Sequence, residues 1–204
     1  MAHIKNIIFD LGGVLLDLDY HKTSIAFQKL GVTNFDELFS QFKANELFEN
    51  IETGKISDED FYDAVEKYCY PGTTRLQIEA AWNAMLLGFR VEALETLKDL
   101  RKKYRLFLLS NTNNIHLTAF KKIFTADTGL PSIDVFFDKA YYSHLIQMRK
   151  PYETTYHFVL DDAGIIADET LFIEDSIQNV EGARAVGIHT HLLLPAERIE
   201  DLHL

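Results

Sequence analysis

The sequence predicts a doubly wound parallel α/β sheet, with helices on both faces and a helical bundle inserted after the first strand. Two observations predict the sheet. Short, nearly all-apolar runs recur along the chain, which is typical of strands buried on both faces. Amphipathic stretches long enough for crossover helices separate the later runs. A third observation predicts the insertion, because residues 20–87 show helical periodicity and no convincing strand.

The elements of the predicted sheet domain follow in order along the chain. Five runs are expected to be strands: Ile4–Phe9, Leu106–Leu109, Val135–Phe137, Leu171–Ile173 and His189–Leu194. Four stretches are expected to be helices: Val91–Lys103, Asn114–Phe124, Tyr152–Ala163 and Asn179–Val186. Strands that alternate with helices in this way imply parallel pairing through right-handed crossovers.

The inserted segment is expected to be a small helical bundle. Its predicted helices cover Thr23–Leu30, the spaced side chains Phe35, Leu38, Phe39 and Phe42, a segment that begins after Ser57, and Leu76–Leu87. Ser57 precedes an acidic first turn, as an N-cap residue does. The aromatic side chains are interpreted as the core of the bundle, and Trp82 as packing where the bundle meets the sheet. We therefore expect residues 1–18 and 88–204 to form the α/β core and residues 19–87 the helical domain.

Composition limits the classes of partner. The chain has 204 residues and a formal net charge of −11, which disfavours nucleic acid and anionic membranes because both bind basic surfaces. Cys69 is the only cysteine, so no intrachain disulfide is possible. No apolar stretch approaches the roughly 20 residues of a membrane helix, and the N-terminal apolar run is too short for a signal peptide. A soluble, cytoplasmic protein is expected, and no oligomeric state is predicted.

Polar residues suited to chemistry stand at the ends of four predicted elements. These are Asp10-Leu11-Gly12-Gly13, Ser110-Asn111-Thr112, Arg149-Lys150-Pro151 and Glu174-Asp175-Ser176. Each segment alone has an ordinary structural explanation as a helix cap, a turn or a solvated charge. Open parallel sheets, however, bind ligands at the carboxyl ends of their strands. The four segments together therefore indicate one site.

This set of segments resembles the haloacid dehalogenase (HAD) superfamily of phosphotransferases over essentially the whole chain. The resemblance implies a Rossmann-like core and makes the inserted helices a type I cap. Phe9–Val14, Ser110–Asn113, Met148–Pro151 and Gly54–Glu59 look more narrowly like the branch that contains bacterial α-D-glucose-1-phosphate phosphatase.

The resemblance also implies roles for individual residues. Asp10 would be the nucleophile and form an aspartyl-phosphate, and Ser110 and the backbone N–H of Asn111 would hold phosphate oxygens. Lys150 would neutralise Asp10 and the transferred group. Mg²⁺ would be held by Asp10, Asp175 and the carbonyl of Gly12, with Glu174 as a further ligand, a ligand through water, or a group that supports the others.

The sequence departs from the superfamily pattern at Gly12, where most of its phosphatases carry a second aspartate as the general acid. Loss of this acid affects poor leaving groups most, which predicts a preference for sugar 1-phosphates. Asp17, Asp19, His21 and His116 are alternative acids, although a structural or surface role is favoured for each.

The function expected from these observations is Mg²⁺-dependent hydrolysis of small phosphorylated metabolites, with sugar phosphates such as glucose 1-phosphate favoured. One alternative is a carbon–halogen hydrolase. Those enzymes also lack the second aspartate but need no divalent metal, and the retained Asp175 beside Glu174 argues against this alternative. The other alternative is a catalytically weak protein that binds a phosphorylated ligand.

Overall fold

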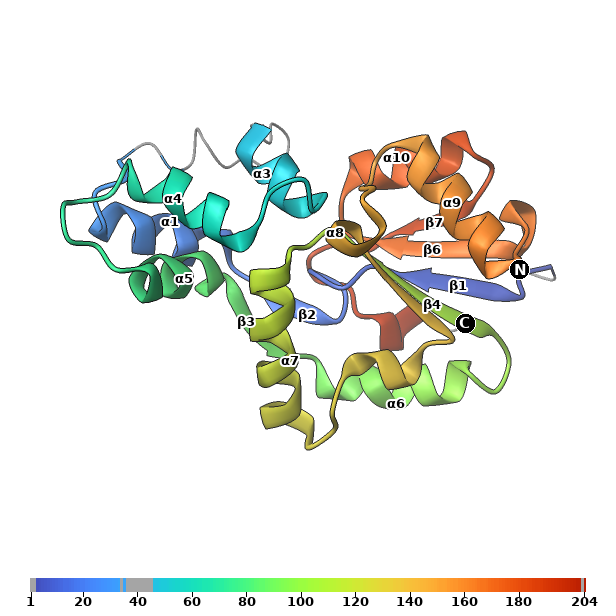
Figure 1. Cartoon of the computed structure of the whole chain (residues 1–204). Coiled ribbons are helices and arrows are strands. Elements are labelled where there is room, and N and C mark those ends of the chain that lie inside the picture. Colours follow the sequence, from blue (N-terminus) through green and yellow to red (C-terminus); the bar gives the residue numbers. More distant parts are fainter. Residues whose placement is uncertain (1–2, 34, 36–45, 203) are drawn as a thin grey trace.

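The sheet has five strands, all parallel, at the centre of an α/β fold (Figure 1). The structure is a computed structural model that describes residues 3–33, 35, 46–202 and 204. In sequence order, the strands of this sheet are β1 (Asn6–Phe9), β4 (Arg105–Ser110), β5 (Lys139–Tyr142), β6 (Thr170–Glu174) and β7 (His189–Leu192). Their spatial order is β5-β4-β1-β6-β7, so the predicted fold class is confirmed.

Helices cover both faces of the sheet, as the buried runs of the strands require. On one face lie α6 (Val91–Leu100) and α7 (Asn114–Thr128), and on the other α9 (Glu153–Ala163) and α10 (Ile177–Ala185) (Figure 1). Successive side chains of β1 point to opposite faces of the sheet. Ile7 and Phe9 belong to the core beneath α6 and α7, and Ile8 to the core beneath α9 and α10.

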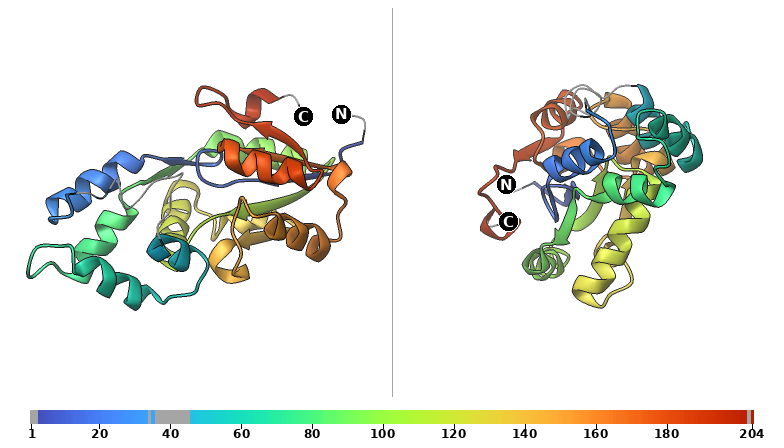
Figure 2. Two further views of the ribbon diagram at one scale, coloured as in Figure 1. Left: turned by 90° about the horizontal axis from the view of Figure 1, so that it is seen from above. Right: turned by 90° about the vertical axis from the view of Figure 1, so that its left-hand side faces the viewer.

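Within the described part of the chain, α1 (Tyr20–Lys29), α3 (Glu46–Glu52), α4 (Asp58–Glu66) and α5 (Arg75–Asn83) form a group of helices at one end of the sheet (Figures 1 and 2). The helix α4 begins at a capping box, in which Ser57 and Asp60 each bond the other's backbone N–H, as the acidic first turn predicts. Phe27, Phe48, Phe61 and Trp82 pack in the core of this group. These four helices are called the helical cap below.

Two short strands, which were not predicted from the sequence, connect the helical cap to the sheet. They are β2 (Leu16–Leu18) and β3 (Leu86–Phe89), which pair antiparallel as a two-stranded ribbon. The expected helix Leu76–Leu87 is therefore too long, because α5 ends at Asn83. After it, the backbone of Met85 bonds the Thr23 hydroxyl and the Asp19 N–H. The expected return of the chain near Gly88 falls inside β3, and the domain boundaries stay a prediction.

One expected strand is wrong. Residues Val135–Phe137 lie in and just after a 3₁₀ helix, η1 (Ile133–Phe136), and the strand next to β4 is β5 instead. Ser132 caps η1 by accepting a hydrogen bond from the N–H of Asp134, and Val135 is exposed. The apolar run is thus one turn of helix with one buried side. The short α8 (Ser143–Ile146) follows β5, and η2 (Ala167–Glu169) and η3 (Ile199–Leu202) are two further 3₁₀ helices.

The predicted helix that contains Leu38, Phe39 and Phe42 lies outside the described residues. Within the described part of the chain, no helix is both long enough and apolar enough to cross a membrane.

Candidate active site

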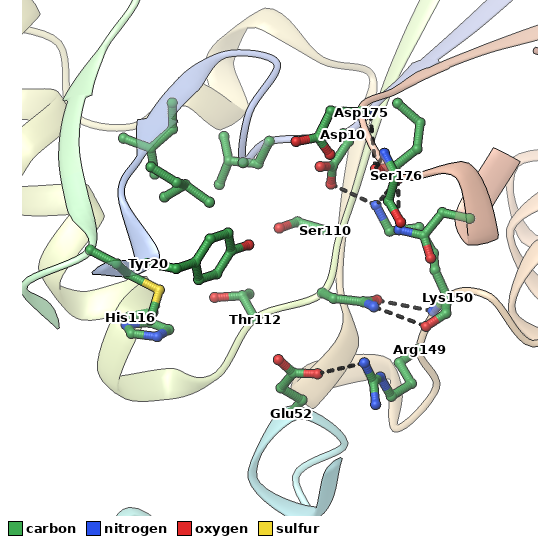
Figure 3. A pocket seen from close by; sticks show the side chains of 18 of the residues that line it. Asp10, Tyr20, Glu52, Ser110, Thr112, His116, Arg149, Lys150, Asp175 and Ser176 are labelled. Atoms are coloured by element: carbon green, nitrogen blue, oxygen red, sulfur yellow. Dashed lines mark hydrogen bonds and ion pairs between the residues drawn. The ribbon is translucent and has the colours of Figure 1, made fainter. Parts of the chain in front are cut away.

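A cavity of about 160 Å³ lies where the carboxyl ends of β1, β4 and β6 face the helical cap. The sheet contributes Asp10, Ser110, Glu174 and Asp175 to its lining, and the loop before α9 contributes Arg149 and Lys150. Side chains of the helical cap, among them Tyr20, Glu52 and Trp82, line it as well (Figure 3). The cavity therefore brings together segments that are far apart in the sequence.

Lys150 lies between two carboxylates at the floor of this cavity. Its Nζ donates to Oδ1 of Asp10 and to Oε2 of Glu174, both at 2.6 Å. The Lys150 side chain is 1% exposed, so these two ion pairs are shielded from solvent. Charge-assisted hydrogen bonds of this kind fix the positions of the groups they join. The nucleophile candidate Asp10 is thus held by a cation from a different segment of the chain.

The electrostatics of this group follow from burial. Burial raises the pKa of Asp10 to about 7, and the nearby charge of Glu174 acts in the same direction. Burial also raises the pKa of Glu174. Burial disfavours the ammonium of Lys150, but the carboxylates of Asp10 and Glu174 outweigh this effect and raise its pKa. Lys150 is therefore held in its charged form, whereas burial favours the protonated forms of Asp10 and Glu174.

The side chain of Asn111 holds the backbone of Lys150. Its Nδ2 donates to the carbonyl of Lys150 and its Oδ1 accepts from the N–H of Lys150, both at 2.9 Å. Ser143 makes a similar pair of bonds to the backbone of Thr112. These contacts join the end of β4 to the loop that carries Lys150. The side chain of Asn111 therefore positions this loop, while its backbone N–H is expected to donate to the phosphate.

Glu174 is saturated by protein donors. Its Oε1 accepts from the N–H groups of Asp175 and Ser176 at 3.1 Å, and its Oε2 accepts from Asn179 Nδ2 at 3.0 Å in addition to Lys150. A carboxylate with four donors is well placed to orient the loop after β6. Asp175, by contrast, is exposed toward the cavity.

Gly13 makes room for the carboxylate of Asp175. A Cβ at Gly13 would overlap Oδ2 of Asp175, and the φ of +73° is in the left-handed region that favours glycine. Carboxylate oxygens of Asp10, Glu174 and Asp175 lie within 4.8 Å of one another. Three carboxylates face one ammonium in this cluster, and an all-oxygen donor set suits a hard divalent cation. The residues present thus fit a magnesium site.

A family model described as haloacid dehalogenase-like hydrolase matches residues 4–187. The chain belongs to this family. The HAD hydrolase is 32% identical over 188 residues to a D-ribitol-5-phosphate phosphatase of Bacteroides thetaiotaomicron, with 92% of this chain and 90% of the relative covered. It is 28% identical to a sesquiterpene phosphatase of Aspergillus oryzae. This match covers 90% of this chain and 87% of the relative.

A solved structure agrees with the fold of the HAD hydrolase. The crystal structure of a HAD family enzyme of B. thetaiotaomicron, in complex with magnesium and inorganic phosphate, superposes with a TM-score of 0.89 at 35% identity. The match covers 98% of this chain and all of that one.

The HAD hydrolase brings all of the site residues expected from the sequence to one cavity. Asp10, Gly12, Ser110, Asn111, Lys150, Glu174 and Asp175 all line it. The alternative acids are less well placed. Asp17 pairs with Arg90 at 2.7 Å, and Asp19 caps α1 through the N–H of His21. His116 does line the cavity, but burial lowers its pKa to about 3, so it is neutral near pH 7.

Tyr20 and Glu52 of the HAD hydrolase face the cavity without having been predicted, and Arg149, named before only as part of the segment that carries Lys150, faces it as well. Tyr20 turns its hydroxyl into the cavity from the start of α1, and Glu52 and Arg149 lie beside each other at its wall (Figure 3). A tyrosine or a glutamate in an amphipathic helix gives no signal of its own in the sequence. Arg149 directly precedes Lys150 in the sequence, and this adjacency is the signal that could have indicated its place at the cavity.

Proposed function

We propose that this HAD hydrolase is a Mg²⁺-dependent phosphomonoesterase for small polyhydroxylated phosphate esters. The observation that carries the proposal is the buried group of Asp10, Lys150 and Glu174, with Asp175 turned toward the same cavity. The D-ribitol-5-phosphate phosphatase and the magnesium- and phosphate-bound enzyme support it, because both are similar to this chain over nearly its whole length.

Asp10 acts as the nucleophile in the proposed reaction. An oxygen of its carboxylate forms a bond to phosphorus as the bond from phosphorus to the ester oxygen breaks, and the departing oxygen takes up a proton. Water then attacks phosphorus, inorganic phosphate leaves, and the carboxylate of Asp10 is restored. Asp10 and Asp175, with the carbonyl of Gly12, would hold Mg²⁺, which supplies positive charge to the phosphoryl oxygens.

Other residues orient the phosphate. The hydroxyl of Ser110 and the N–H of Asn111 would donate to its oxygens, and Lys150 would balance the charge that these oxygens share with Asp10. Tyr20 is a candidate hydrogen-bond donor to the departing oxygen, which takes its proton from water because Gly12 offers no acid side chain. Burial and the nearby carboxylate of Asp175 raise the pKa of Tyr20, which keeps its hydroxyl protonated.

Two features of the chain bear on which phosphate ester is its substrate. Gly12 favours esters with good leaving groups, and glucose 1-phosphate is such an ester. Similarity to the D-ribitol-5-phosphate phosphatase favours an alditol phosphate instead. Both are small and rich in hydroxyl groups, which is the class proposed. The cluster of three carboxylates argues against a metal-independent carbon–halogen hydrolase.

A screen for phosphate release tests the proposal. The purified chain is assayed with sugar phosphates, alditol phosphates, nucleotides and p-nitrophenyl phosphate, with Mg²⁺ and with EDTA. We expect Mg²⁺-dependent release that Asp10→Asn reduces by about 10³-fold or more. Activity that survives EDTA, halide release from 2-haloacids, or the absence of turnover with every ester would contradict the proposal.

A further inference from the structure

Glu52 and Arg149 form a polar wall at the side of the cavity away from Asp10 and Asp175 (Figure 3). Glu52 comes from the end of α3 in the helical cap, whereas Arg149 directly precedes Lys150. A substrate phosphate beside Lys150 therefore places the rest of the substrate within reach of Arg149. The two side chains are called the polar wall below.

The ion pair of the polar wall is incomplete. Nη2 of Arg149 lies 3.2 Å from Oε2 of Glu52, and Nη1 lies 3.8 Å from Oε2 of Glu49. Oε2 of Glu52, the oxygen of this ion pair, and Nε of Arg149 are shielded from solvent, and neither makes a hydrogen bond among the described residues. Figure 3 shows Oε2 of Glu52 turned toward Arg149, whereas the other carboxylate oxygen, Oε1, is turned toward the cavity and can accept from a ligand there.

Buried charged groups with spare hydrogen-bonding capacity favour a ligand that completes it. We infer that the polar wall binds hydroxyl groups of the substrate, with Glu52 accepting from them and Arg149 donating to them. A hydroxyl group both donates and accepts, so neighbouring hydroxyls can serve the two side chains at once. This inference rests on the proposed function, and it names the feature that selects the substrate.

The polar wall also disfavours two other kinds of phosphate ester. A terpenyl chain, as in the substrate class of the sesquiterpene phosphatase, would cover Glu52 and Arg149 without meeting their hydrogen bonds. A second phosphate beside Arg149 would also face the carboxylates of Glu52 and Glu49. Hydroxylated substrates avoid both costs, so the wall discriminates by hydrogen bonding.

Three variants test the inference against two kinds of substrate. Glu52→Gln and Arg149→Lys each weaken the polar wall while keeping side chains of similar size. Glu49→Gln is the matched control, because Glu49 lies on the same helix and near the same arginine but does not line the cavity. D-ribitol 5-phosphate and glucose 1-phosphate carry hydroxyl groups, and p-nitrophenyl phosphate carries none outside its phosphate.

We expect Glu52→Gln and Arg149→Lys each to lower kcat/KM for the hydroxylated esters by about 10- to 100-fold. The value for p-nitrophenyl phosphate should stay within about threefold, as should every value for Glu49→Gln. In the Asp10→Asn background, Glu52→Gln should raise the Kd for D-ribitol 5-phosphate by a similar factor. That measurement separates binding from turnover.

Two results would overturn the inference. Equal losses of kcat/KM with both kinds of ester would show that the polar wall holds the helical cap in place and does not bind the substrate's hydroxyl groups. No loss of kcat/KM with either kind of ester would show that the polar wall does not contact the substrate. Failure of the proposed function looks different, since the wild-type chain would then release no phosphate from p-nitrophenyl phosphate with Mg²⁺.

Discussion

At the scale of single residues, the neighbouring Gly12 and Gly13 differ in backbone conformation and in the space available for a Cβ atom. Gly13 has a φ of +73° and borders the carboxylate of Asp175, so both its backbone and its missing Cβ matter. Gly12 has no such φ, and a Cβ there would meet the end of the flexible Leu18 side chain. The two positions thus tolerate alanine to different extents.

Gly13→Ala should displace Asp175 and strain the backbone. We expect it to lower the free energy of unfolding by about 1–2 kcal/mol, and kcat/KM with p-nitrophenyl phosphate by about 10²-fold or more. Gly12→Ala is the control and should cost clearly less on both measures, because the side chain of Leu18 can turn away. Urea unfolding and steady-state kinetics supply the values, and equal effects at the two positions would refute the explanation.

The sequence predicted the charged residues of the site but not how they are held. Asp10, Lys150 and Asp175 each stand next to a strand end or a helix start, which local patterns reveal. The side chain of Asn111 bonds the backbone of Lys150, 39 residues away. The carboxylate of Glu174 accepts hydrogen bonds from backbone N–H groups of the loop after β6. Such contacts depend on tertiary structure, so no local pattern could indicate them.

At the scale of elements, the contact between α5 and α7 joins the helical cap to the sheet. The ring of Trp82 stacks on His116 with centroids 4.8 Å apart and an interplanar angle of 10°. Nδ1 of His116 lies 2.8 Å from Oδ1 of Asn83. The expectation that Trp82 packs where the helices meet the sheet agrees with this contact. His116 is neutral there, because burial lowers its pKa to about 3.

This contact should make stability depend on pH. An unfolded histidine takes up a proton below about pH 6.5, whereas folded His116 resists protonation until about pH 3, so stability falls as pH decreases across that window. Between pH 7 and pH 5 the loss from this group is about 2 kcal/mol. Urea unfolding of wild type and His116→Gln at both values measures it. A pH-dependent loss of the same size in the variant would rule His116 out as its source.

Elements were predicted well where burial alone decides them. The parallel strands β1, β4 and β6 are mostly apolar runs covered on both faces, and α6 buries a stripe of Ala93, Leu94, Leu97 and Leu100. The ribbon of β2 and β3 was missed because each strand is short and pairs with a partner far along the chain. The run Val135–Phe137 was misread because three apolar residues fit one helical turn as well as a strand.

At the scale of the whole molecule, the net charge of −11 and the carboxylate cluster lead to one expectation about metal. A cation held by Asp10 and Asp175 binds the folded chain and not the unfolded one. Mg²⁺ at about 100 times its Kd should therefore add about 2.7 kcal/mol of stability and raise Tm by about 5 °C or more.

Thermal scans with and without Mg²⁺ check this expectation. Asp175→Asn should lose most of the shift in Tm, whereas Asp168→Asn should retain it, because the exposed Asp168 lies outside the cluster. An equal shift in both variants would mean that Mg²⁺ binds elsewhere on the acidic surface.

The central claim is that Asp10 carries the phosphoryl group during turnover. The measurement that tests it most directly is mass spectrometry of the wild-type chain, quenched in acid during turnover of a phosphate ester with Mg²⁺. We predict one added phosphoryl group on the peptide that contains Asp10, absent with EDTA and absent in Asp10→Asn. Phosphate release that continues at the wild-type rate in Asp10→Asn, with no phosphorylated peptide in either protein, would contradict the claim.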